Sequence, residues 1–116
     1  MTAYCIAYES INDPNTFEEY RRQVMATLEA HGGRFIVRGG ATECVEGAWD
    51  AERTVVIEFP SMDQARAWYH GEAYQELAAI RREASTADFV LVEGVPDDGP
   101  EARRSSQDAG LDAPRR

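Results

Sequence analysis

The sequence predicts an α+β domain in which strands and helices follow one another in the order strand, helix, strand, strand, helix, strand. The chain has 116 residues, of which 43% are hydrophobic and 28% charged, so its length and composition suit one soluble domain with a modest core. Short runs rich in aromatic and β-branched residues alternate with longer runs whose apolar residues recur at helical spacing. No segment repeats at the period of a solenoid.

The first strand is expected over residues 3–10, and the turn residues Asn12, Asp13 and Pro14 end it. Asp13 suits the N-cap of a helix and Pro14 its first position. Glycines 32 and 33 should end this helix, because glycine readily adopts the left-handed conformation of a C-cap. The buried stripe of the helix is predicted to comprise Phe17, Tyr20, Val24 and Leu28.

Further strands are predicted over residues 34–38, 53–59 and 88–93, and residues 42–47 are a candidate for a short edge strand. Ser61 and Gln64 form a capping box that opens a second helical region, which Gly71 interrupts before residues 72–82 continue it. This order is typical of a ferredoxin-like sandwich, with an antiparallel sheet and its helices on one face. The domain spans residues 1–95, and residues 96–116, poor in large apolar side chains, are expected to be a disordered tail.

A sheet covered by helices on one side leaves its other side open. In a domain of this size the open face would be a large apolar patch, and pairing with a second copy covers it. We therefore expect a homodimer.

Charge and composition exclude several classes of function. The formal net charge is −9 and no basic cluster is interleaved with aromatics, so a nucleic-acid partner is not expected. No apolar run is long enough for a membrane span, and the first residues do not resemble an export signal, so we expect no membrane association and a cytoplasmic protein. Cys5 and Cys44 are then expected to be free thiols. Neither nucleotide loops nor paired metal ligands occur, so no cofactor and no metal are expected.

A set of short motifs resembles one bacterial family. The motifs lie at residues 32–40, 46–47, 53–61, 67–69, 74–75, 81 and 88–94. Together they resemble the family of unknown function numbered 1330, of the dimeric α/β-barrel superfamily, over nearly all of residues 3–95. The resemblance implies a ferredoxin-like protomer whose sheet packs on that of its partner to form a shared barrel, but no reaction. Relatives elsewhere in the superfamily include cofactor-free monooxygenases, isomerases or lactone-forming enzymes, and haem proteins. The family usually has serine where this chain has Gly71.

Arg38 and Glu58 are the first candidate site residues. Regular alternation places Phe35 and Val37 toward the helices and Arg38 on the opposite face, together with Glu58. There Arg38 is suited to hold a carboxylate or enolate and Glu58 to act as a general base. The alternative is an ion pair between the two that fixes the geometry of the dimer.

Aromatic residues around the Gly71 break are the second group of candidates. Trp68, Tyr69 and Tyr74 are suited to form the wall of a substrate pocket, although an aromatic stripe at helical spacing is more often core. His70 has the ordinary pKa for acid–base catalysis near neutral pH, or it is a surface residue at a helix end.

These observations predict a dimeric barrel that binds a small acidic or carbonyl-bearing molecule. One hypothesis is a cofactor-independent enzyme of the proton-transfer or isomerase, cyclase or monooxygenase type, with Glu58 and His70 as catalytic residues and with Arg38, Trp68, Tyr69 and Tyr74 binding the substrate. The alternative is a non-catalytic binding or accessory protein of a metabolic pathway.

Overall fold

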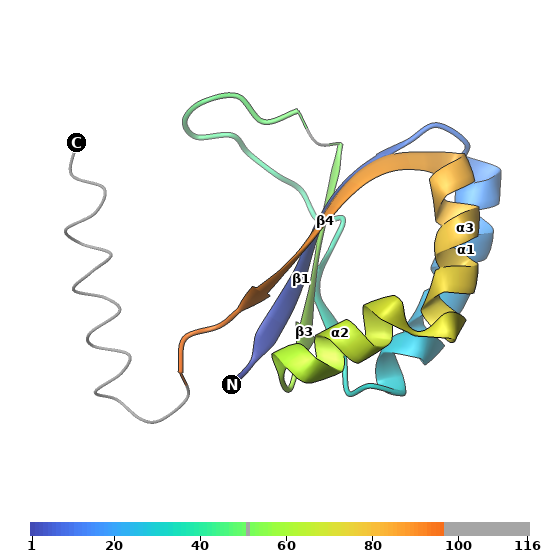
Figure 1. Cartoon of the computed structure of the whole chain (residues 1–116). Helices are drawn as coiled ribbons and strands as arrows, with labels where there is room; N and C mark the ends of the chain where they lie inside the picture. The colour runs from blue at the N-terminus through green and yellow to red at the C-terminus, as the bar shows by residue number, and fades with distance from the viewer. Residues whose placement is uncertain (51, 97–116) are drawn as a thin grey trace.

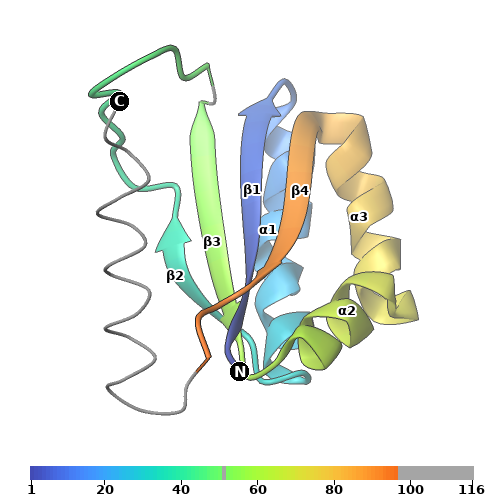
Figure 2. The same cartoon turned by 60° about the vertical axis from the view of Figure 1, so that its left-hand side comes forward.

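Four antiparallel strands form one sheet in the order β2-β3-β1-β4. The computed structural model describes residues 1–50 and 52–96. Three helices cover one face of the sheet and leave the other face open (Figures 1 and 2). This is the predicted ferredoxin-like α+β fold. The elements in chain order are β1 (Ala3–Ile11), α1 (Pro14–Glu29), β2 (Arg34–Arg38), β3 (Arg53–Phe59), α2 (Met62–His70), α3 (Glu72–Ala84) and β4 (Ser85–Glu93).

Helix α1 begins and ends as its sequence predicts. The Asp13 carboxylate accepts a hydrogen bond from the backbone N–H of Thr16 at 3.2 Å, and Pro14 occupies the first turn. The chain leaves the helix through Gly32, whose φ of +73° is favourable only for glycine. A side chain at Gly33 would come within 2.6 Å of the Phe59 ring, so the glycine lets α1 and β3 meet closely.

The second helical region consists of two helices, because Gly71 has an extended backbone conformation (φ −72°, ψ 154°) between α2 and α3. The Ser61 hydroxyl caps α2 by accepting from the N–H of Gln64 at 3.1 Å. Strand β4 follows α3 directly and begins three residues earlier than expected. Its first residue pairs with Ile11, so the length of β1 sets where β4 starts.

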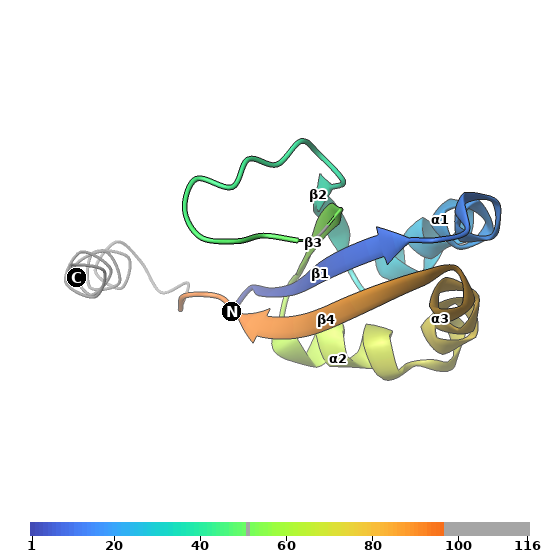
Figure 3. The ribbon, with the colours of Figure 1, turned by 90° about the horizontal axis from the view of Figure 1, so that it is seen from above.

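The predicted edge strand at residues 42–47 does not form. Residues 39–50, which follow β2, form an irregular loop that extends away from the sheet (Figure 3). Gly39 and Gly47 both have positive φ, which interrupts the extended conformation that a strand requires. The side chain of Trp49 folds back from this loop onto Tyr8 of β1, with the two ring centres 4.5 Å apart.

Strand β2 departs from regular alternation. It pairs with β3 through Arg34–Glu58 and Phe35–Ile57, and then, after a bulge at Ile36, through Val37–Val56 and Arg38–Val55. The bulge moves Val37 to the open face, where it is 39% exposed, and turns Arg38 toward the helices. The predicted placement of both residues is therefore wrong, because a bulge inserts one residue and reverses the alternation beyond it.

The core lies between the helices and the sheet face that they cover. The largest fully buried side chains there are Trp68, Tyr74, Phe59, Leu28 and Cys5. On the other face, valines and Ile36 remain exposed; the most exposed of them, Val90, is 54% accessible. The predicted tail lies outside the described residues except for Pro96.

Candidate functional site

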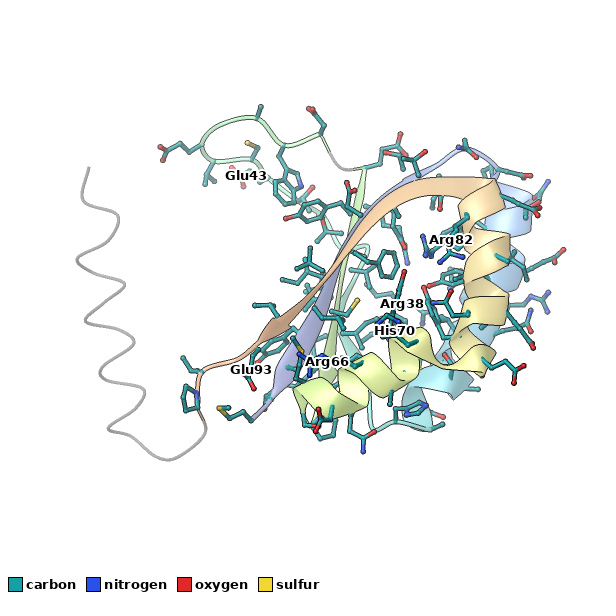
Figure 4. All side chains as sticks on the ribbon, viewed as in Figure 1. Arg38, Glu43, Arg66, His70, Arg82 and Glu93 are labelled. Atoms are coloured by element: carbon teal, nitrogen blue, oxygen red, sulfur yellow. The ribbon has the colours of Figure 1, made fainter. Side chains whose placement is uncertain are left out.

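A narrow cavity between α1 and the sheet is lined by three arginines and by the buried carboxylate of Glu9. Its volume is about 20 Å³, which is room for about one water molecule. Arg38 lies between the sheet and the helices (Figure 4) and is one of the residues that line the cavity. The cavity is lined by Glu9, Phe17, Tyr20, Arg21, Val24, Phe35, Arg38, Arg53, Val55, Ile57 and Phe89.

Arg38 is the cation of this cavity that lacks a counterion in the described part of the chain. Its Nη2 donates to the backbone carbonyl of Arg21 at 3.0 Å, and its guanidinium carbon lies 4.0 Å from the centre of the Phe35 ring. Its Nε is buried without a hydrogen-bond partner among the described residues. Burial, together with the nearby charges of Arg21 and Arg53, lowers the pKa of the guanidinium. An anion would satisfy both the charge and the unused donor.

Glu9 is buried on the helix side of β1 and paired with Arg53. The Arg53 Nε donates to the Glu9 carboxylate at 3.0 Å, and the Glu9 side chain is only 3% exposed. Burial raises the pKa of Glu9, and the opposing effects of Arg53 and Arg81 do not cancel it. A carboxylate with a raised pKa beside a cavity has the property that a general base requires.

A line of hydrogen bonds leads from the cavity into the core. The Tyr20 and Tyr74 hydroxyl oxygens are 2.9 Å apart, and the Nε of Arg81 donates to Tyr74 at 3.2 Å. Desolvation raises the pKa of both phenols, so both stay neutral at physiological pH. Arg81 is 4% exposed and its guanidinium lies over the Phe89 ring at 4.2 Å.

The three predicted aromatic residues form one cluster. The ring centres of Trp68 and Tyr74 are 4.1 Å apart, and those of Tyr69 and Tyr74 are 5.5 Å apart. Trp68 is 1% exposed and donates its indole N–H to the Thr27 hydroxyl, so its visible role is packing. Tyr69 is half-buried and reaches Phe89 of the cavity wall, with a separation of 6.0 Å between ring centres. As substrate-binding residues these three stay predictions.

The expected contact between Arg38 and Glu58 is absent, because the bulge places them on opposite faces of the sheet. Glu58 instead accepts a hydrogen bond from Arg34 at 2.8 Å on the open face. His70 ends α2 as an exposed residue, with its ring 5.2 Å from that of Tyr69. Neither Glu58 nor His70 lines the cavity at Arg38, and their catalytic roles stay predictions.

Four residues of the site were not among the predicted ones: Glu9, Tyr20, Arg53 and Arg81. Tyr20 was predicted to be buried but was not proposed for the site, and the three charged residues each have a signal in the sequence. Glu9 and Arg53 are in phase with the buried residues of their strands, and Arg81 lies on the buried stripe of α3 with Tyr74 and Leu77. A charged residue at a position where periodicity predicts burial is the signal that would have identified them.

Within residues 1–50 and 52–96, no group of three or more histidine, cysteine, aspartate or glutamate side chains is arranged to hold a metal ion. No helix in the same ranges is both long and apolar enough to cross a bilayer.

Solved structures of similar fold include proteins with and without a described activity. A protein of unknown function from Rhodopseudomonas palustris superposes with a TM-score of 0.65 at 14% identity, covering 82% of this chain and 83% of that one. SnoaB, a cofactor-independent oxygenase from Streptomyces nogalater, superposes with a TM-score of 0.57 at 16% identity, covering 85% of this chain and 98% of its own. At such identities the similarity supports the fold alone.

No curated protein matches the chain. A family model does match it, over residues 2–95, and this range contains every strand and helix of the fold. The chain therefore belongs to the family described as Domain of unknown function (DUF1330).

Proposed function

We propose that this protein is a homodimer in which each protomer binds a small organic anion in the cavity between α1 and the sheet. The observation that carries the proposal is the state of Arg38. Its guanidinium is half-buried and unpaired by any carboxylate of the described residues, and its buried Nε has no hydrogen-bond partner among them. Such a group is costly unless a ligand satisfies it.

The charge of the cavity favours an anion. Of the three arginines in the lining, Arg21 pairs with Glu18 and Arg53 pairs with Glu9. The charge of Arg38 is left unbalanced, although the chain as a whole carries −9. A local positive potential in an acidic protein raises the concentration of small anions at that place. The remaining lining is aromatic or aliphatic, which suits a ligand with an apolar body.

The same site supports cofactor-independent proton transfer. Arg38 would stabilise an enolate or carboxylate oxygen, and Glu9, whose pKa burial raises, would accept a proton from the adjacent carbon. The similarity in fold to SnoaB, a cofactor-independent oxygenase, supports this class of chemistry. Glu58 and His70 are the alternative proton acceptors. Glu58 lies on the open face of the sheet, and His70 lies at the end of α2.

The dimer would form through the open face of the sheet. Ile36, Val37, Val90 and Val92 are between 39% and 54% exposed. No helix lies over the open face of the sheet (Figure 2). A contiguous apolar patch of this kind on a small domain is typical of an interface. Light scattering should give twice the chain mass for the wild type and the chain mass for Val90→Lys. Val45→Lys, in the loop between β2 and β3, is the matched control and should remain dimeric; a monomeric wild type would contradict the proposal.

Binding is tested by thermal shift against aromatic and aliphatic carboxylates, phenols and 1,3-dicarbonyl compounds. A ligand at 100 times its dissociation constant stabilises the folded protein by about 2.7 kcal/mol. The shift should disappear in Arg38→Gln and persist in Arg34→Gln, which changes an arginine on the opposite face. Absence of any shift, or a shift equal in both variants, would contradict an anion site at Arg38.

Catalysis is separated from binding by solvent deuterium exchange at the carbon next to the bound carbonyl, followed by NMR. If Glu9 is the general base, the wild type exchanges this proton with solvent. The Glu9→Gln variant should then bind the ligand without exchanging the proton. Loss in Glu58→Gln or in His70→Gln would move the catalytic role to that residue. Binding without exchange in the wild type would identify a non-catalytic binding protein.

A further inference from the structure

The line of hydrogen bonds from Arg81 through Tyr74 to Tyr20 begins with a donor of fixed direction. Arginine carries only hydrogen-bond donors, so the Tyr74 oxygen must accept from Arg81 across the 3.2 Å contact. The Tyr74 hydroxyl has one proton of its own to donate. Among the described residues, the oxygen of Tyr20, 2.9 Å away, is the acceptor within hydrogen-bond distance of it. Either hydroxyl can donate across this contact. We adopt donation by Tyr74, because Tyr20 borders the cavity and can donate its own proton to a ligand there, whereas Tyr74 does not border it.

This direction leaves the proton of Tyr20 unused by the protein. The Tyr20 oxygen accepts from Tyr74, and no described residue accepts from the Tyr20 hydroxyl. Tyr20 is 6% exposed and lines the cavity. A buried donor without an acceptor is unfavourable, so the free O–H requires an acceptor that the cavity must supply.

Tyr20 and Arg38 face the same small space from two elements, α1 and β2. They are close enough for the tyrosine to affect the pKa of the guanidinium. Thus two donors border a cavity of about 20 Å³: the Nε–H of Arg38, which has no partner among the described residues, and the O–H of Tyr20, which is free when Tyr74 donates to Tyr20. That volume is room for about one water-sized group, such as one oxygen atom of a ligand.

We propose that Tyr20 and Arg38 together bind one oxygen of a phenolate or enolate ligand, with Arg81 and Tyr74 as positioning residues that orient the Tyr20 hydroxyl. This inference rests on the proposed anion site and specifies its ligand class. The ligand is a single-oxygen anion on a flat apolar body, because Phe17, Phe35 and Phe89 wall the cavity and the polar space admits one oxygen. Arg38 is half-buried and is held by one backbone hydrogen bond and by the Phe35 ring, and its displacement would make room for the body of the ligand.

The test uses 4-nitrophenol, whose anion absorbs visible light and whose neutral form does not. Titration with the full-length protein gives a dissociation constant and the apparent pKa of the bound phenol. The wild type should bind the anion more tightly than the neutral form and so lower this pKa below that of the free phenol. Tyr20→Phe should weaken binding of the anion about tenfold and raise the pKa of the bound phenol by about one unit relative to the wild type, because one hydrogen bond to a charged oxygen is lost. Tyr4→Phe, on the open face, is the control and should leave both values unchanged.

The outcomes separate this inference from the proposed function. If Arg38→Gln abolishes binding while Tyr20→Phe matches the wild type in affinity and in the bound pKa, the role of Tyr20 is wrong and the anion site stands. If Arg38→Gln has no effect, the anion site itself is wrong. Should Tyr20→Phe not fold, Tyr74→Phe carries the test: it should raise the pKa of bound 4-nitrophenol in a protein that retains binding, and an unchanged pKa would overturn the proposal.

Discussion

Phe35 and Arg38 lie on the same side of β2, with the guanidinium carbon 4.0 Å from the centre of the phenyl ring. Residues three apart in a regular strand point to opposite faces. The bulge at Ile36 brings them together, because the strand resumes its pairing at Val37 with one residue left over. The bulge therefore lets Arg38 share the helix-covered face with Phe35 although three positions separate them.

Deletion of Ile36 should leave Arg38 in the cavity. Without the extra residue, the pairs Arg34–Glu58, Phe35–Ile57, Val37–Val56 and Arg38–Val55 form an unbroken ladder with the same facing. We expect the variant to fold and to keep ligand binding, as measured by thermal shift. Deletion of Val55 from β3 is the control and should abolish folding, because every residue beyond it changes face. If the protein lacking Ile36 folds but no longer binds the ligand, the assignment of Ile36 as the extra residue of the bulge is wrong.

Removal of the Arg53 guanidinium should destabilise the protein in a pH-dependent way. Arg53→Met leaves the carboxylate of Glu9 buried without its hydrogen-bonded partner. We expect the free energy of unfolding to fall by about 2 kcal/mol at neutral pH, which is less than for a fully buried ion pair because the Arg53 side chain is 21% exposed. The pKa of Glu9 is already raised from 4.5, so the folded state takes up a proton more readily than the unfolded state. The contribution of Glu9 to stability is therefore complete below pH 4.5 and is lost as pH rises through the raised value.

Chemical denaturation across this pH range checks the prediction. The deficit of Arg53→Met should shrink as the pH falls toward 4.5, where Glu9 becomes neutral. The double variant Glu9→Gln with Arg53→Met contains no buried carboxylate at this place, and its deficit should not vary with pH. A deficit of Arg53→Met that is constant with pH would show that Arg53 acts by packing alone.

The two thiols should differ in reactivity. Cys44 is exposed and should react with a thiol reagent in the folded protein, whereas Cys5 is buried and should react only after unfolding. Desolvation raises the pKa of Cys5 from 9.0 to about 12. Its contribution to stability is present below pH 9.0 and is lost between 9.0 and about 12, by at most about 1.4 kcal/mol per pH unit. Cys5→Ala should show a shallower alkaline loss of stability than Cys44→Ala; identical alkaline profiles would contradict the burial of the Cys5 thiol.

Gly71 should be sensitive to the side chain that replaces it. An added Cβ would lie 2.8 Å from the carbonyl oxygen of Ala67, so Gly71→Ala should lose about 1 kcal/mol. Helix α3 has no side-chain cap at this position, and a serine hydroxyl would supply one. Gly71→Ser should therefore be about 0.5 to 1 kcal/mol more stable than Gly71→Ala in urea denaturation. Equal stability of the two variants would contradict the capping argument.

Local signals predicted most of the fold. The cap at Asp13, the helical spacing of Phe17 to Leu28 and the β-branched run of β3 each contain their evidence within a few residues. The starts and ends of strands were harder to predict from the sequence. Strand β4 begins at Ser85 because β1 extends to Ile11 and provides its pairing partners. Such limits are set by a neighbouring strand, and no local pattern shows them.

The site was predicted only in part, for two physical reasons. Arg38 was a candidate anion-binding residue in the sequence, and that role stays a prediction. Its predicted face was wrong because a bulge has no fixed sequence signature in this strand. Glu9 and Arg81 are buried because each finds partners far along the chain, Arg53 for Glu9 and Tyr74 for Arg81. A buried charge depends on its partners, so its role appears only once they are placed together.

A crystal structure of the protein with the best ligand of the thermal-shift screen tests the central claim most directly. Our account predicts density for the ligand between α1 and the sheet, with an oxygen within hydrogen-bond distance of Arg38 and its body against Phe35. Density on the open face beside Arg34 and Glu58, with the cavity at Arg38 unchanged, would contradict it.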